Sequence, residues 1–136
     1  YVLGEGPERE ALTQQIAKDG LQEEFFLLGA CSNPYPYFAQ ADIYVHATGF
    51  EGKSIAIQEA QILGCPIIAS DINWEQIQHG VDGLICPLDA KAVASAVQEL
   101  IENPAQRKRL GQAAQHKNVS FTEDIQMLDQ LLANES

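Results

Sequence analysis

Short apolar runs alternate along the chain with longer segments in which apolar residues recur every three or four positions. The short runs are typical of strands buried on both faces, and the longer segments are typical of amphipathic helices. The predicted strands cover residues 1–6 (running into a glycine turn), 24–29, 42–47, 66–70 and 83–88. The predicted helices cover residues 7–20, 33–41, 54–64, 73–80, 89–103, 104–118 and 122–136.

Residues that start and stop helices support these segments. Pro7 stands at a plausible first helical position and Gly20 at a helix end. Asp89 and Ser54 are suited to cap the N-termini of the helices that follow them. Pro104 is expected to break one helix and to begin another.

Strands that alternate with helices predict an α/β fold, here a Rossmann-like parallel sheet with helices on both faces. At 136 residues and 46% apolar content, the chain is predicted to form one domain over residues 1–136. Ligands of such sheets bind outside the carboxyl ends of the strands, so the residues after each strand are the candidates for a site.

The net charge and the length of the apolar runs limit the classes of partner that this chain is expected to bind. The net charge of −11 disfavours nonspecific binding to nucleic acid or anionic lipid. No apolar run approaches the roughly 20 residues that span a bilayer, and no signal peptide opens the chain. We expect a cytoplasmic protein. The chain begins with Tyr-Val-Leu-Gly rather than Met, which suggests a fragment of something longer.

Three cysteines lie far apart, with no Cys-x-x-Cys spacing. This pattern is weak evidence for a metal site or a disulfide and agrees with a reducing compartment. Cys31, Cys65 and Cys86 are therefore predicted to be buried, small apolar side chains.

Two glutamates, Glu51 and Glu59, flank a Gly-Lys-Ser turn. Chance alone supplies about one glutamate pair at this separation, because the chain holds 12 glutamates, so the spacing by itself proves nothing. The setting is more informative. Glu51 follows a predicted strand, Gly52 permits close backbone approach, and the helix that Ser54 caps offers free amides to an anion. Glu59 is expected about 7 to 8 Å up that helix, an arrangement suited to a nucleotide diphosphate with a sugar on each side.

Four stretches in order resemble the glycosyltransferase group 1 family, the retaining glycosyltransferases with the GT-B fold. They are "LGEGPEREAL", "FFLLGACSNPYPYFAQADIYVHAT", "EGKSIAIQEAQILGCPIIASD" with its E-x7-E motif, and "HGVDGLICPLDAKAVASAVQELIENPAQRKRL". The resemblance implies the carboxy-terminal, donor-binding half of an enzyme that transfers a glycosyl group from a nucleotide sugar with retention.

The resemblance also implies roles for individual residues. Glu51 would contact hydroxyls of the donor sugar, and the backbone from Gly52 to Ser54 would contact the sugar and the diphosphate. Glu59 would hold the ribose hydroxyls. The loop from Gly29 to Ser32, with Cys31, would lie against the nucleobase. No metal or other cofactor is implied, because the helix dipole and basic side chains replace it.

Some features depart from the family pattern. The Arg and Lys that grip the diphosphate, and the acceptor-binding amino-terminal domain, are expected outside this chain. We therefore expect the chain alone to bind donor weakly and not to turn over. A glycan or lipid-linked acceptor, and any membrane association, would come through those other parts. A nucleotide-sugar epimerase and a non-catalytic Rossmann-like interaction domain are the alternatives.

Four residues near this edge have two interpretations each. Lys53 either compensates near the phosphate or points into solvent. His46 ends a predicted strand and serves either the structure or a sugar contact. Asp71 and Asn73 follow the next strand and either border the site or cap a helix.

Overall fold

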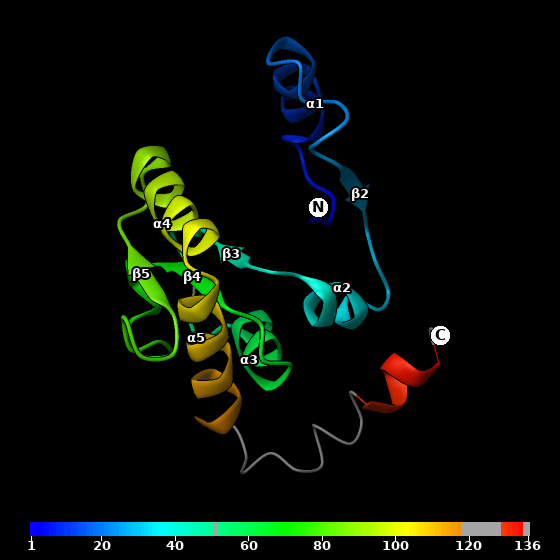
Figure 1. The fold of residues 1–136 in the computed structure, drawn as a ribbon. Helices are drawn as coiled ribbons and strands as arrows, with labels where there is room; N and C mark the ends of the chain where they lie inside the picture. The colour runs from blue at the N-terminus through cyan, green and yellow to red at the C-terminus, as the bar shows by residue number, and fades with distance from the viewer. Residues whose placement is uncertain (51, 118–128, 135–136) are drawn as a thin grey trace. The chain divides into compact units, whose positions relative to one another are not determined.

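A computed structural model describes residues 1–50, 52–117 and 129–134 (Figure 1). The chain divides into two compact units, Tyr1–Pro34 and Tyr35–Ser136. Each unit has its own parallel sheet, with two strands in the first unit and three in the second. The prediction of a single domain over residues 1–136 is not tested by this division and stays a prediction.

The first unit is a strand–helix–strand motif made of β1 (Val2–Leu3), α1 (Arg9–Lys18) and β2 (Leu27–Gly29). The two strands are parallel, and the amide of Gly4 donates to the carbonyl oxygen of Gly29 at 2.7 Å. The helix begins at Arg9 rather than at Pro7, because residues 7 and 8 form a turn. Gly20 follows the helix with a φ of 68°, a conformation that glycine adopts without strain.

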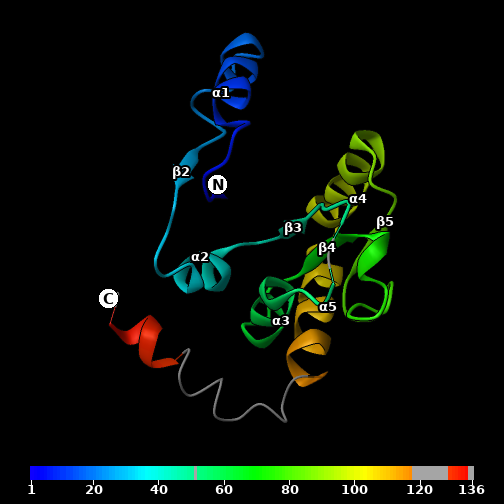
Figure 2. The same cartoon turned by 180° about the vertical axis from the view of Figure 1, so that it is seen from behind.

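The second unit holds a three-stranded parallel sheet in the order β3-β4-β5, seen from two sides in Figures 1 and 2. Its elements are α2 (Tyr35–Gln40), β3 (Tyr44–His46), α3 (Ile55–Ile62), β4 (Ile67–Ser70), the short 3-10 helix η1 (Asp71–Asn73), β5 (Leu84–Cys86), α4 (Ala90–Glu102) and α5 (Pro104–Lys117). All three strands are shorter than the apolar runs that predicted them.

The central strand β4 is buried on both faces, as its continuous apolar run predicts. Ile67 and Ala69 belong to a core cluster with residues of α2 and α3, including Phe38 and Ile57. Ile68, on the opposite face, belongs to a second cluster with residues of β5, α4 and α5. Successive residues of a strand point to opposite faces, so helices cover both faces of this sheet. The predicted fold class is confirmed.

Both predicted helix caps of this unit are present. The hydroxyl of Ser54 accepts from the amide of Ile57 at 3.2 Å, and the carboxylate of Asp89 accepts from the amide of Ala92 at 3.0 Å. Pro104 begins α5 as predicted. Each cap satisfies an amide of a first helical turn that has no acceptor within the helix.

The helix predicted over residues 73–80 is wrong. The segment forms η1, ending at Asn73, and then turns. The carboxylate of Asp82 accepts from the amide of Gln78 at 2.8 Å, and Gly80 has a φ of 78°. A side chain thus takes the amide that a helix would bind to its own backbone.

Only part of the helix predicted at the C-terminus lies among the described residues. Residues 129–133 are helical, in agreement with the helix predicted over 122–136, whose remaining residues lie mostly outside the described part of the chain. Within the described part, no helix combines the length and the apolar character that crossing a membrane requires.

Helices α3 and α5 approach each other closely where two glycines meet. Gly64 follows α3 with a φ of 71°. A Cβ atom on Gly111 of α5 would collide with the carbonyl oxygen of Gly64 and would lie 3.6 Å from the Cδ of Pro66. The absence of a side chain at Gly111 therefore permits the packing that holds α3, the helix that carries Glu59.

Candidate functional site

The candidate site lies at the carboxyl edge of the three-stranded sheet, in the segment that joins β3 to α3. The structure brings His46, Gly52, Lys53, Ser54 and Glu59 into the second unit. The other two predicted site residues belong to the first unit, where Gly29 ends β2 and Cys31 lies two residues beyond it. Glu51 lies outside the described residues.

Ser54 is almost fully buried and its polar atoms are all engaged within the protein. Its hydroxyl caps α3, its amide donates to Gln76 Oε1 at 2.7 Å, and its carbonyl oxygen accepts from Gln76 Nε2 at 2.8 Å. The amides of Ile55 and Ala56, in the first turn, have no acceptor within the helix. These two amides, rather than the amide of Ser54, are the groups that α3 can offer to an anion.

Gly52 and Lys53 are exposed. Apart from its chain neighbours, no described residue has an atom within 4 Å of the position that a Cβ of Gly52 would take, so a ligand could approach this backbone closely. The exposure of Lys53 agrees with either of its two interpretations.

Glu59 is half-buried on α3 and is held by a residue that the sequence did not single out. The hydroxyl of Tyr35, on α2, donates to Glu59 Oε1 at 3.0 Å. Burial raises the pKa of Tyr35 above its ordinary value, and the hydrogen bond and charge of Glu59 raise it further. The phenol therefore stays protonated at neutral pH and orients this carboxylate as a hydrogen-bond donor.

His46 has a structural contact. Its Nδ1 lies 2.7 Å from the hydroxyl of Tyr44, and the two rings lie 5.7 Å apart. Tyr44 in turn packs edge-on against Phe38 of the core. This supports the structural interpretation of His46, while its contact with a sugar stays a prediction.

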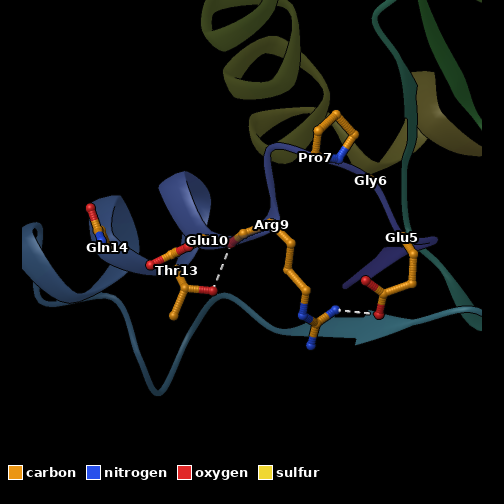
Figure 3. A pocket seen from close by; sticks show the side chains of 7 residues that line it. All are labelled: Glu5, Gly6, Pro7, Arg9, Glu10, Thr13 and Gln14. Carbon is orange, nitrogen blue, oxygen red and sulfur yellow. Dashed lines mark hydrogen bonds and ion pairs between the residues drawn. The ribbon is translucent and has the colours of Figure 1, made fainter.

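In the first unit, Gly29 is buried with a φ of 76°. This positive φ at the end of β2 favours glycine, because an L side chain there would be strained. A Cβ would also lie 2.8 Å from Glu5 Oε1, the end of a flexible side chain that would have to shift. Glu5 pairs with Arg9 at 2.9 Å beside an open hollow at the start of α1 (Figure 3). Arg9 also donates to the carbonyl oxygen of Leu27 at 3.3 Å, which ties α1 to β2.

The cysteines differ from one another. Cys65 and Cys86 are buried as predicted, but the prediction is wrong for Cys31, which is exposed and donates to the carbonyl oxygen of Asn33 at 3.3 Å. Burial, followed by the charge of Asp42, raises the pKa of Cys65 to about 12. Burial, followed by the charge of Asp71, also raises the pKa of Cys86.

Iodoacetamide at pH 8 is expected to label Cys31 at least tenfold faster than Cys65. The thiolate is the reactive form, and a pKa of about 12 leaves the Cys65 thiol almost entirely protonated at this pH. Peptide mass spectrometry of the full-length protein measures both rates, with urea-unfolded protein as the control in which both thiols react. Equal rates in the folded protein would contradict the burial of Cys65.

Asn73, at the end of η1, is 2% exposed. Its carboxamide nitrogen and oxygen have no hydrogen-bond partner among the residues that the structure describes. The expectation that this side chain caps a helix is therefore not met. An unpaired buried amide costs about 1–3 kcal/mol. Among the described side chains of this edge, Asn73 would therefore gain the most free energy from a hydrogen-bond partner.

Two further polar side chains hold the ends of the segment between β3 and α3. The hydroxyl of Ser70, at the end of β4, donates to the carbonyl oxygen of Thr48 at 2.6 Å and accepts from its amide at 3.0 Å. Gln76 does the same for Ser54 with its carboxamide. Neither contact could be predicted, because nothing near Ser70 or Gln76 in the sequence points to partners 22 residues away.

Comparisons with known proteins agree with this fold. The profile of the family described as "Glycosyl transferases group 1" matches residues 1–103. The chain is 34% identical over 70 residues to an N-acetylgalactosaminyltransferase of Campylobacter jejuni that acts on a diphospho-undecaprenol-linked sugar, which covers 52% of the chain and 19% of that protein. It is 29% identical over 129 residues to an exopolysaccharide phosphotransferase of Streptomyces coelicolor, covering 91% of the chain and 14% of that protein.

Solved structures show the same similarity. Anabaena HepE in complex with UDP superposes with a TM-score of 0.80 at 25% identity, covering 98% of this chain and 39% of HepE. The C-terminal domain of a glycosyl transferase group 1 family protein from Francisella tularensis superposes with a TM-score of 0.75 at 25% identity, covering 84% of this chain and 62% of that one.

The chain thus spans less than two thirds of each of these proteins, and its match to the family profile runs over 103 of its 136 residues. The resemblance seen in the sequence is confirmed, including its assignment to the C-terminal part of a GT-B fold. The chain belongs to the glycosyl transferases group 1 family.

Proposed function

We propose that this chain is the donor-binding domain of a retaining glycosyltransferase. The enzyme moves a glycosyl group from a UDP-, GDP- or ADP-sugar to a glycan or lipid-linked acceptor. The observation that carries the proposal is the arrangement on α3, where Ser54 caps the helix and the carboxylate of Glu59 stands five residues farther along, held by Tyr35. A helix start that attracts a diphosphate therefore lies within reach of an oriented carboxylate.

The chemistry of the donor matches these groups. The diphosphate would accept hydrogen bonds from the amides of Ile55 and Ala56 and would gain from the helix dipole. Glu59 would accept from the two ribose hydroxyls, and Glu51 from hydroxyls of the transferred sugar. Because amides and the helix dipole face the diphosphate, the proposal requires no metal or other cofactor at this position.

By the family resemblance, the nucleobase would contact the residues from Gly29, which ends β2, to Ser32, including Cys31, largely through backbone groups. His46 and Lys53 would border the sugar and the diphosphate. UDP is the favoured nucleotide, since HepE, to which the chain is similar, was solved with UDP. A saturating donor is expected to slow the alkylation of the exposed Cys31.

The acceptor is drawn from the relatives. The Campylobacter jejuni enzyme extends a glycan carried on diphospho-undecaprenol, which supports a lipid-linked or polysaccharide acceptor. With a net charge of −11, nucleic acid is not proposed as a partner. We propose the cytoplasm as the place of the reaction, because Cys31, Cys65 and Cys86 are free thiols, which agrees with a reducing compartment.

A product analysis tests the proposal. The full-length protein is incubated with each nucleotide sugar and a set of glycan and lipid-linked acceptors, and the anomeric configuration of the product is read by proton NMR. Transfer with the donor's configuration preserved is expected, and inversion would contradict a retaining mechanism. Interconversion of the nucleotide sugar without any acceptor would instead show an epimerase.

One relative motivates a second outcome. The Streptomyces coelicolor protein is a phosphotransferase, so a related enzyme could move a sugar phosphate instead of a sugar. Phosphorus NMR of acceptor and product distinguishes the two, because only the phosphotransferase adds a new phosphodiester to the acceptor. We expect a product that contains no phosphorus beyond that of its acceptor, and release of the nucleoside diphosphate.

A further inference from the structure

We infer that Gln76 is a positioning residue of the donor site, which fixes the backbone at Ser54 and thereby sets the segment from Gly52 to the first turn of α3. This inference rests on the proposed function. Gln76 lies in the turns after η1, outside the E-x7-E motif in the sequence. The fold brings its side chain into contact with Ser54, which lies within that motif.

The contact between Gln76 and Ser54 is specific for a carboxamide. Gln76 Oε1 accepts from the amide of Ser54 at 2.7 Å while Gln76 Nε2 donates to the carbonyl oxygen of the same residue at 2.8 Å. The side chain thus replaces a neighbouring strand, offering one donor and one acceptor to one residue. Gln76 is 9% exposed and Ser54 1%, so water competes little for these bonds.

Gln76 is itself held in place from two helices. Its backbone carbonyl oxygen accepts from Gln61 Nε2, on α3, at 2.9 Å and from Lys117 Nζ, at the end of α5, at 2.8 Å. Lys117 also pairs with the buried carboxylate of Asp82 at 3.0 Å. The backbone of Gln76 therefore has little freedom, and its side chain acts on Ser54 from a rigid base.

The segment between β3 and α3 is held at its other end, at Thr48, in the same manner. Ser70 makes both a donated and an accepted hydrogen bond with the backbone of Thr48, at 2.6 and 3.0 Å. Residues 48 and 54 are thus each fixed by a side chain, that of Ser70 at the end of β4 and that of Gln76 in the turns after η1. A segment with both ends fixed loses less conformational freedom when it closes on a ligand, which is the advantage of preorganisation.

A purely structural role for Gln76 predicts a different result from a positioning role, and a matched pair of variants separates them. Gln76→Met removes both hydrogen bonds while keeping the length of the side chain. Gln115→Met is the control, because Gln115 Nε2 also donates to a backbone carbonyl oxygen, that of Ile62, at 3.3 Å, at the opposite end of α3.

Both variants are made in the full-length protein, and three quantities are measured. These are the thermal unfolding temperature, the Kd for UDP-glucose and the amide hydrogen exchange of residues 52–57. Gln76→Met is expected to raise the Kd at least tenfold and to speed exchange at Ser54. Gln115→Met is expected to lower the unfolding temperature without changing the Kd more than twofold. Gln76→Glu keeps the acceptor for the Ser54 amide but sets a carboxylate oxygen against the Ser54 carbonyl oxygen. It is therefore expected to raise the Kd at least as much as Gln76→Met, and serves if Gln76→Met does not fold.

The inference is overturned if Gln76→Met or Gln76→Glu binds UDP-glucose as wild type does, or if the Gln115→Met control weakens binding as much. Failure of the proposed function looks different, since wild type would then bind no nucleotide sugar at all. In that case hydrogen exchange decides alone. Selectively faster exchange at Ser54 in Gln76→Met would support the positioning contact, and unchanged exchange would overturn it.

Discussion

Replacement of Glu51 by Gln in the full-length protein is expected to lower kcat by about 10²- to 10³-fold, the range seen when one preorganised stabiliser of a transition state is removed. Gln keeps the shape of the side chain but loses the negative charge, and we propose that this charge favours the donor sugar as positive charge develops at its anomeric carbon. The KM for donor is expected to change less than kcat, because Glu51 is assigned to the sugar and not to the nucleotide. Initial rates at several donor concentrations measure both constants.

The matched control is Glu99→Gln. Glu99 is an exposed glutamate of α4 that accepts from Gln106 Nε2 at 3.0 Å. It shares the chemistry of Glu51 but lies on a helix that makes no part of the proposed site, so its variant is expected to keep the wild-type rate. A Glu51→Gln enzyme with a kcat within threefold of wild type would remove Glu51 from the catalytic role.

Leu100→Ala is expected to lower the free energy of unfolding by about 2–5 kcal/mol. Leu100 is 0% exposed, and it packs in one cluster with Ile68 of β4, Leu84 of β5 and Leu110 of α5. Truncation removes buried methyl groups and leaves a cavity where a sheet face meets two helices, so the loss is felt by all three layers. Urea unfolding followed by circular dichroism measures the change.

The neighbouring residue provides the control. Ile101 lies on the same helix but is 55% exposed, and Ile101→Ala is expected to lower the free energy of unfolding by less than about 1 kcal/mol. Equal losses for the two variants would contradict the packing of α4 against the sheet.

The architecture of the second unit could be predicted because its strongest signals are local or periodic. The run from Ile67 to Ser70 is buried at every position, as a strand covered on both faces must be. Ser54 and Asp89 cap helices because a short polar side chain before an apolar segment satisfies an amide three residues on. Each of these features depends on residues within a few positions of one another.

The errors arose where a nearby side chain or a turn won over helical propensity. Residues 73–80 have a composition compatible with a helix, but the Asp82 carboxylate takes the amide of Gln78 and Gly80 adopts a positive φ. A turn also replaces the predicted first residues of α1. Pro7 is compatible with a first helical position but lies in a turn two residues before Arg9.

The place of the candidate site followed from a general property of parallel sheets, whereas its internal contacts did not. Tyr35 meets Glu59 across 24 residues, and Gln76 meets Ser54 across 22. No periodicity or spacing in one sequence encodes such a pair, since the fold alone brings the partners together. The exposure of Cys31 escaped prediction for the same reason, because burial depends on what packs against a loop.

Calorimetric titration of the full-length protein with UDP-, GDP- and ADP-sugars tests the central claim most directly. We predict saturable binding of at least one of them. We also predict a Kd at least tenfold higher in Glu59→Ala, a larger loss than in Glu51→Ala, with unfolding curves showing that both variants are folded. The absence of saturable binding to every nucleotide sugar would contradict the assignment of a donor site. A greater loss of nucleotide affinity in Glu51→Ala than in Glu59→Ala would contradict the assigned roles of the two glutamates.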